Sequence, residues 1–325
     1  MRAPVRTLIG LDIGGSKIAC VEGTAEAQIL QRIELPAEAE RPFEQTLPLL
    51  CDAIRSLQMS ATAQAREIVG MSVAVGGPLQ IGSGLLLDPP HLPGWHRVPL
   101  KQRLAECFPS WSIHIEHDGN AGALAEYRFG AGRGRTDLQH LVFLTFGTGL
   151  GAGFIINGRI LHGASDTAGE IGHWRLSEDG PPGFGKNGSW EGYASGAGLV
   201  QVAAALFPER WTARTPIRTL VEAMLRDEPD ALAVARYAGE RMGQGLALLV
   251  DALNPQLIVL GSLAVALGDR VLSPARAVVA REALPQAAAA CCIVPAVLGV
   301  RIGDVACLMA ALEDGAVRER LHRSG

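Results

Sequence analysis

Two glycine-rich turns, each set between apolar strands, most constrain how this chain can fold. The first is DIGGSKIA at residues 12–19, and the second is GTGLGAGF at residues 147–154. About 135 residues separate them, a domain-sized rather than a solenoid-sized period. Helix-like and strand-like segments follow each turn. The pattern predicts a duplicated α/β fold of two lobes with a cleft between them.

The length and composition agree with two packed domains. The chain has 325 residues, of which 48% are hydrophobic and 19% charged, and domains average roughly 100–200 residues. We expect an N-terminal lobe over 1–119 and a C-terminal lobe over 120–303. The apolar stripe after residue 304 predicts a helix over 304–325 that packs back on the N-terminal lobe.

Charge and apolar patterning exclude several classes of protein. The net charge of −4 argues against a nucleic-acid-binding surface that relies on bulk charge. The apolar run 245–267 is interrupted by Asp251, Asn254 and Pro255, which indicates a buried helix and strand rather than a membrane span. The six cysteines form no C-x-x-C pair, and the N-terminus lacks the apolar segment of a signal peptide. We therefore expect a cytoplasmic protein with reduced, core-packed thiols.

The two turns together favour phosphate binding. Taken alone, the first could be the tip of an ordinary β-hairpin, but the stretch TFGTGLGAG at the second carries four glycines, two hydroxyls and no charge. Bare backbone suits a ligand's phosphates, and Asp12 could hold Mg²⁺ through water. The phosphate chain could belong to ATP or to polyphosphate. The predicted phosphate contacts are Asp12, Gly14, Gly15, Ser16, Lys17, Gly147, Thr148, Gly149 and Gly151.

Four polar residues are candidates for acceptor chemistry. Asp118 ends a predicted strand and precedes a predicted helix, so it could take a proton from a substrate hydroxyl or merely cap the helix. Glu170, His173 and Glu191 lie in a segment rich in Gly and Pro. They could bind the hydroxyls of a polyol, or they could be ordinary surface groups.

Taken together, these segments resemble the ROK family of sugar kinases and sugar-responsive repressors. The resemblance rests on the stretches GLDIGGSKIA, PPHLPGW, EHDGNAGALAE, TFGTGLGAGFIINGRILHGA, GEIGH and WEGYASG, with a looser match at NPQLIVLGSL. It implies an actin-like (ribonuclease H-like), hexokinase-type fold, a homodimer, and transfer of a phosphoryl group from ATP to a hexose, with glucose as the first choice. N-acetylhexosamines, mannose and fructose remain open as acceptors.

The resemblance also implies roles for individual residues. Asp118 is the implied catalytic base and Asp12 the carboxylate on the Mg²⁺ side. Gly261 would approach the adenosine. Ser262 follows it where the family usually has another glycine, and His91 and His117 stand where the family usually has Asn. The implied sugar contacts are Gly77, His91, His117, Asp118, Glu170, His173 and Glu191.

One departure concerns zinc. The family usually holds a structural zinc with three cysteines and the His of its Gly-His pair, here His173. The three cysteine positions are occupied by Pro182, Phe184 and Ser189. Because Pro and Phe cannot ligate zinc, we predict no zinc site, a loop held instead by packing of Phe184 and Trp190, and a His173 left free to donate to the sugar.

Two rival functions remain. A repressor would need a DNA-binding unit, and because the first turn begins near residue 10, we expect no such unit ahead of it. A sugar-binding protein that has lost catalysis is the other rival, and the changes at His91 and His117 favour it. The presence of Asp12, Asp118 and both turns argues against it.

Overall fold

Within residues 4–322, which the computed structural model describes, the chain divides into two compact units. The first unit contains the chain up to residue 125, the segment 162–168 and the chain from residue 300 onward. The second unit contains residues 126–161 and 169–299. Segment 162–168 therefore belongs to the first unit although the sequence around it belongs to the second.

The first unit is built on a five-stranded mixed sheet with the order β3-β2-β1-β4-β7. Strands β1 and β2 are antiparallel and flank the first glycine-rich turn, whereas β4 and β7 run parallel to β1. A short hairpin, β5 and β6, precedes helix α2. The strands are β1 (Val5–Ile13), β2 (Lys17–Gly23), β3 (Ile29–Pro36), β4 (Arg66–Val75), β5 (Leu79–Gln80), β6 (Leu85–Leu86) and β7 (Ser112–His117).

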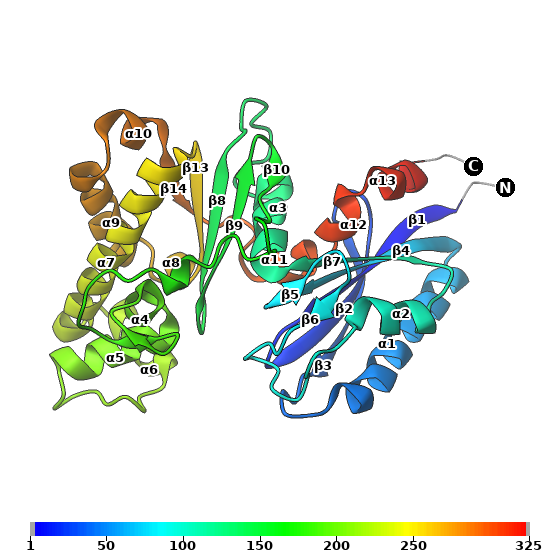
Figure 1. Ribbon diagram of the computed structural model, residues 1–325, viewed down its shortest axis with the longest axis horizontal. Coiled ribbons are helices and arrows are strands. Elements are labelled where there is room, and N and C mark those ends of the chain that lie inside the picture. The colour runs from blue at the N-terminus through cyan, green and yellow to red at the C-terminus, as the bar shows by residue number, and fades with distance from the viewer. Residues whose placement is uncertain (1–3, 323–325) are drawn as a thin grey trace. The chain divides into compact units, whose positions relative to one another are not determined.

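Helices cover both faces of this sheet (Figure 1). Alternate residues of β1 point to opposite faces: Ile9, Leu11 and Ile13 pack in a buried cluster with α1 and α2, whereas Gly10 faces Cys307 and Leu308 of the C-terminal segment. The helices are α1 (Phe43–Ala63), α2 (Leu100–Cys107), α11 (Ile302–Ala306), α12 (Met309–Glu313) and α13 (Gly315–His322). Helix α3 (Asp118–Phe129) begins in the first unit and ends in the second.

The second unit repeats this sheet, with the order β10-β9-β8-β13-β14 and the same sequence of antiparallel and parallel pairings. Its buried cluster joins Val142, Leu144 and Phe146 of β8 to the helices beside it. The strands are β8 (Leu141–Phe146), β9 (Leu150–Ile156), β10 (Arg159–Ile160), β11 (Pro182–Gly183), β12 (Lys186–Asn187), β13 (Leu257–Ser262) and β14 (Cys292–Pro295). The equivalence of the two sheets confirms the predicted duplicated α/β fold.

Helices pack against the second sheet, with the long α7 and α9 side by side (Figure 1). Residues 4–322 also contain two 3₁₀ turns, η1 (Ile171–His173) and η2 (Gly299–Arg301). The helices are α4 (Trp190–Ala194), α5 (Gly196–Leu206), α6 (Ile217–Leu225), α7 (Pro229–Leu253), α8 (Leu263–Leu267), α9 (Asp269–Glu282) and α10 (Pro285–Ala290).

The apolar run 245–267 folds as predicted. Helix α7 ends at Leu253, and Asn254 takes the left-handed conformation that commonly terminates a helix, with a φ of 44°. Buried strand β13 then begins at Leu257. Across residues 4–322 we find no helix with both the length and the apolar character needed to cross a bilayer.

Two sequence predictions need correction. The single helix expected over 304–325 consists of three short helices, and residues 323–325 of it lie outside the described residues. The last break has a clear cause: Asp314 is extended, and its side chain accepts the N–H groups of Ala316 and Val317, so it starts a new helix. In addition, Cys292 is exposed, so not every cysteine is a core residue.

Candidate active site

The residues predicted from the sequence to form the site divide between the two units. In the first unit are Asp12, Gly14, Gly15, Ser16, Lys17, Gly77, His91, His117 and Asp118. In the second unit are Gly147, Thr148, Gly149, Gly151, Glu170, His173, Glu191 and Gly261.

The first glycine-rich turn lies against the loop that contains His91. The Gly14 N–H donates to the Lys17 carbonyl at 3.1 Å, which closes the turn. A Cβ at Gly15 would lie 2.6 Å from the His91 carbonyl oxygen. Only glycine therefore allows the loop to approach this closely.

Asp12, at the end of β1, lies among like charges. Burial, followed by the charges of Asp118 and Asp304, raises the pKa of its carboxyl, and Lys17 and Arg32 oppose this; the net result is a pKa of about 6. The backbone of Gly303 packs directly on this carboxylate, since a Cβ there would collide with Oδ2. Gly303 and Asp304 were not identified from the sequence, and a glycine followed by an acidic residue in the C-terminal stripe was the available signal.

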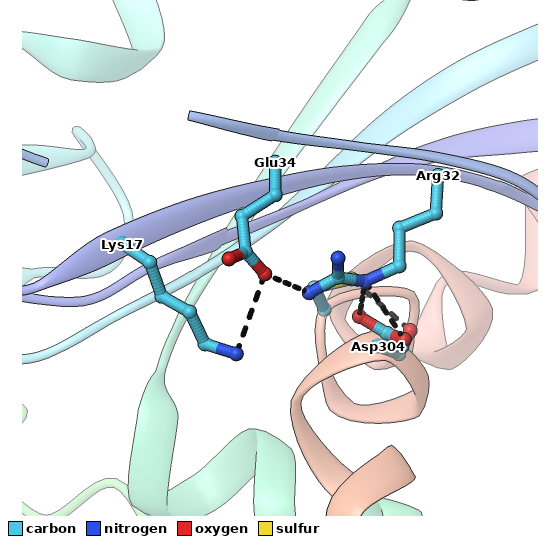
Figure 2. Close-up of polar contacts among 5 residues, drawn as sticks. Lys17, Arg32, Glu34 and Asp304 are labelled. Carbon is cyan, nitrogen blue, oxygen red and sulfur yellow. Dashed lines mark hydrogen bonds and ion pairs between the residues drawn. The ribbon is translucent and has the colours of Figure 1, made fainter. Parts of the chain in front are cut away.

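A chain of ion pairs links Asp304 to the first turn (Figure 2). The Arg32 guanidinium donates to Asp304 Oδ1 at 3.0 Å and to Glu34 Oε2 at 2.6 Å, and Lys17 Nζ lies 3.5 Å from the same Glu34 oxygen. The exposed pairs contribute little to stability. They do place two cations within electrostatic reach of Asp12.

His117, and not Asp118, caps helix α3. The Gly119 N–H donates to His117 Nδ1 at 3.2 Å, the bond expected of a residue that precedes the helix. Asp118 is the first helical residue, and its carboxylate accepts from the adjacent Gly119 N–H at 2.7 Å. Its side chain is 53% exposed, so it is free to meet a substrate.

His91 and His117 pack against two adjacent glycines. A Cβ at Gly76 would collide with the His91 ring, and one at Gly77 would lie 2.9 Å from His117 Cδ2. Burial lowers the pKa of His91, although Asp118 opposes this. Its Nε2 is buried and has no hydrogen-bond partner among the described residues. A neutral imidazole with an unpaired nitrogen is suited to a substrate hydroxyl.

The carboxylate of Glu116 joins His117, Asn120 and His162 through hydrogen bonds. Its buried carboxylate accepts the His117 N–H and the Asn120 side-chain amide through Oε1, and it pairs with His162 Nε2 at 2.8 Å through Oε2. That hydrogen bond raises the pKa of His162. The pair holds segment 162–168 in the first unit, a long-range contact that local sequence patterns do not show.

The second turn lies beside an apolar pocket in the second unit. The pocket has a volume of about 690 Å³. Among the described residues that line it, none carries a charge. The lining includes Gly147 and Thr148 of the turn and Gly196, Ala197, Val200, Ile217, Ser262 and Leu263 beyond it.

Strand β13 lines up with the strand that leads into this turn. Gly261 lies opposite Thr145 in the sheet, and the Thr145 and Ser262 hydroxyl oxygens are 2.9 Å apart. Ser262 has a φ of 52°, a conformation that favours the glycine usual in the family. Gly151 lies in β9, where it pairs with Thr145.

Glu170, His173 and Glu191 gather in the second unit. His173 Nε2 lies 3.9 Å from Glu170 Oε2. Burial raises the pKa of Glu191, as does the charge of Glu170, whereas the Leu150 N–H and His173 lower it. The three groups are therefore within electrostatic reach of one another.

His173 packs on Phe184, one of the three residues that stand where cysteine ligands were expected. The rings of His173 and Phe184 stack with their centroids 3.6 Å apart. Phe184 and Gly185 form the tip of hairpin β11–β12 with φ values of 51° and 69°, the conformation of a type I′ turn. Ser189 Oγ accepts from the Gly192 N–H and caps α4. Within residues 4–322, no three His, Cys, Asp or Glu side chains gather as a metal site.

The sequence of residues 8–311 matches the ROK family. The chain belongs to this family. A glucokinase of Streptomyces coelicolor is 32% identical over 282 residues, 82% of this chain and 85% of that protein. A xylose repressor of Caldicellulosiruptor bescii is 30% identical over 286 residues, 85% of this chain and 70% of that protein.

Solved structures confirm the fold. A ROK family glucokinase from Streptomyces griseus, in complex with glucose and AMPPNP, matches with a TM-score of 0.76 at 28% identity, covering 95% of this chain and 100% of that one. The predicted actin-like, hexokinase-type fold is thus confirmed. Because both kinases and repressors are similar to this ROK protein, family membership alone does not decide its activity.

Proposed function

We propose that this ROK protein is an ATP-dependent hexokinase that phosphorylates a hexose hydroxyl, with glucose as the first candidate and glucose 6-phosphate as its product. The observation that carries the proposal is the uncharged pocket of about 690 Å³ beside the turn at Gly147 and Thr148. An apolar pocket next to bare backbone suits a nucleoside whose phosphates lie on the turn.

In the first unit, Asp118 has the features of a general base. Its carboxylate is half exposed and leaves the capping of α3 to His117. We propose that it orients the acceptor hydroxyl and takes its proton late, as the oxygen attacks the γ-phosphorus, because phosphoryl transfer passes through a loose transition state. The unpaired Nε2 of His91 is proposed to bind a second hydroxyl.

Asp12 fits the role of the carboxylate on the Mg²⁺ side. Burial and the nearby charges of Asp118 and Asp304 raise its pKa to about 6, and kinase sites typically hold Mg²⁺ with one or two carboxylates and the substrate's phosphates. When bound, Mg²⁺ neutralises charge on the phosphates. The chain's own contribution is to position Asp12 at the end of β1, with Lys17 and Arg32 opposing the upward shift of its pKa.

The second unit is proposed to hold the donor phosphates and part of the sugar. Backbone N–H groups of the turn at Gly147–Gly149 would face the phosphates without a counter-charge. Glu170, His173 and Glu191 would bind sugar hydroxyls through charge-assisted hydrogen bonds. The proposal therefore assigns a part of the reaction to each unit, and activity requires both.

Glucose is the first choice because Asp118, Glu170, His173 and Glu191 are all present, as expected for the glucokinase branch. The similarity to the Streptomyces coelicolor glucokinase supports this choice. His91 and His117 replace the usual Asn residues close to Asp118, so an N-acetylhexosamine, mannose or fructose is the alternative acceptor.

A sugar-binding ROK protein without catalysis is the second candidate function, favoured by the similarity to a xylose repressor. The exposed Asp118 and the uncharged pocket argue for catalysis, because a sugar sensor needs neither. The same pocket argues for ATP over polyphosphate, which has no apolar group to fill it.

The decisive experiment is a coupled ADP-release assay over a panel of hexoses and N-acetylhexosamines, with polyphosphate as the alternative donor. We expect turnover with ATP and glucose and little with polyphosphate. Sugar binding by calorimetry with no turnover for any acceptor and donor would instead identify a non-catalytic sugar-binding protein.

A further inference from the structure

Both ends of the second turn are held by one short stretch of the same unit. The Gly196 N–H, at the start of α5, donates to the Gly147 carbonyl at 2.8 Å. At the other end, the Leu150 N–H donates to Glu191 Oε2 of α4, also at 2.8 Å. Two hydrogen bonds from residues 191–196 thus brace the turn from Gly147 to Leu150.

Gly149 provides the space that this brace needs. A Cβ at position 149 would lie 2.6 Å from Glu191 Oε2, so the Glu191 carboxylate would have to move away from the turn to admit it. Gly149 does not have a positive φ, so its backbone conformation does not require glycine. Glycine at position 149 therefore permits the close approach of the Glu191 carboxylate to the turn.

The helix that carries Glu191 is firmly anchored. Trp190 is wholly buried and stacks on Trp174, with an interplanar angle of 15°. It also meets Phe146 of β8 edge-on. Ser189 caps the helix through the Gly192 N–H. Because these contacts fix the backbone next to Glu191, its carboxylate can hold Leu150, and with it the end of the turn, in place.

Only one of the two Glu191 oxygens is used by this brace. Oε2 accepts the Leu150 N–H, whereas Oε1 receives no hydrogen bond from any of the residues 4–322. The carboxylate also lies within electrostatic reach of His173 and Glu170. One side chain therefore connects the turn to the cluster proposed to bind the sugar.

We propose that Glu191 is a positioning residue for the donor phosphates as well as a contact of the acceptor sugar. Oε2 fixes the phosphate-binding turn, and Oε1 remains available to a sugar hydroxyl. The inference rests on the proposed kinase function and deepens it. Because binding linkage is reciprocal, sugar bound at Oε1 and nucleotide bound at the turn strengthen each other through this carboxylate.

Nucleotide affinity without sugar tests the proposal. We would measure AMPPNP binding by calorimetry for the parent, Glu191→Ala, Glu191→Gln and Glu170→Ala. Glu191→Ala loses a charge-assisted hydrogen bond to the turn and should bind about tenfold more weakly. Glu191→Gln keeps an acceptor oxygen and should restore most of the affinity. Glu170→Ala, the matched control, should bind AMPPNP like the parent.

A residue that contacted only sugar would not change nucleotide binding when no sugar is present. Parental AMPPNP affinity in Glu191→Ala would therefore overturn the proposal, as would equal weakening by Glu170→Ala. Circular dichroism of each variant controls for folding, and rescue by Glu191→Gln separates a lost hydrogen bond from a lost fold.

Hydrogen exchange separates this inference from the proposed function. In the ligand-free protein, amides of residues 147–151 should exchange faster in Glu191→Ala and return towards parental rates in Glu191→Gln. Unchanged exchange refutes the brace. If the parent binds no AMPPNP although the exchange changes as expected, the kinase function fails, and with it the role toward donor phosphates.

Discussion

The two glycine-rich turns occupy the same place in equivalent sheets, but the first lies among charged side chains, whereas an uncharged pocket lies beside the second. The first lies next to Asp12, near Asp118 and Lys17. In the second, the position equivalent to Asp12 is Thr145, which is hydrogen-bonded to Ser262, and the pocket beside the turn carries no charge among its described lining residues. The duplicated sheet thus supports two chemistries, with proton and cation chemistry proposed for the first turn and phosphate and nucleoside binding for the second.

The comparison shows where a repeated fold can diverge. In both sheets the buried strand residues serve packing, so they must stay apolar. Asp12 and Thr145, one residue before the strand ends, are only partly buried, so they can change. The following predictions test whether this division of roles holds, beginning with the largest expected effect.

Removing the proposed base should have the largest effect. Asp118→Asn keeps the size of the side chain but not its basicity, so kcat should fall by about 10²–10⁴-fold. The fold should persist, because His117 caps α3. Initial rates and circular dichroism measure the two quantities. A parental rate in a well-folded variant would show that the first turn's surroundings do not supply the base.

Asp12→Asn should abolish most activity yet stabilise the fold at high pH. The pKa of Asp12 rises from 3.8 to about 6 on folding, so the folded state binds a proton more readily than the unfolded chain. This contribution to stability is complete below about pH 4 and is lost as the pH rises through about 6. The variant's free energy of unfolding minus that of the parent should therefore be about 2–3 kcal/mol larger at pH 8 than at pH 4.

Urea unfolding of the parent and Asp12→Asn at the two pH values measures this difference. Glu26→Gln is the control, because Glu26 is an exposed acidic residue of the same unit away from Asp12. A difference that does not grow with pH would contradict the burial of an ionised Asp12.

Giving the second turn the charge of the first should impair the donor site. Thr145→Asp places a carboxylate beside the backbone proposed to hold phosphates, so nucleotide affinity should fall by about tenfold or more through like-charge repulsion. Thr145→Val removes only the hydrogen bond to Ser262 and should have a smaller effect. Calorimetry with AMPPNP distinguishes them, and equal affinities in all three proteins would argue against phosphate binding at this turn.

The smallest effect is expected from metal removal. His173 stacks on Phe184 where the family usually has zinc ligands, so chelation should leave the Tm unchanged. Phe184→Ala should lower the Tm by a few degrees, because a half-exposed ring loses part of its packing. Metal analysis of the purified protein provides the direct check, and stoichiometric zinc would contradict the prediction.

Much of the fold could be predicted because its signals are local. Apolar runs, glycine-rich turns and the Asn254-Pro255 break are readable along the chain, and each corresponds to an element of the structure. The three short C-terminal helices could not be predicted, because the capping role of Asp314 competes with a continuous apolar stripe.

Sequence patterns propose the residues of the candidate site but do not reveal the contacts among them. Asp12, Asp118 and the turns follow from residue types and positions. The packing of Gly303 on Asp12 and the pairing of His162 with Glu116 join segments far apart in the chain, so no local pattern reveals them.

The sequence by itself determined the duplication, the two turns and the absence of cysteine at positions 182, 184 and 189, because each depends on residue type and spacing along the chain. Only the tertiary structure decided that His117 caps α3 in place of Asp118, that Gly149 makes room for Glu191, and that Phe184 stacks on His173. These depend on where side chains meet in space, and packing rather than local preference sets those meetings.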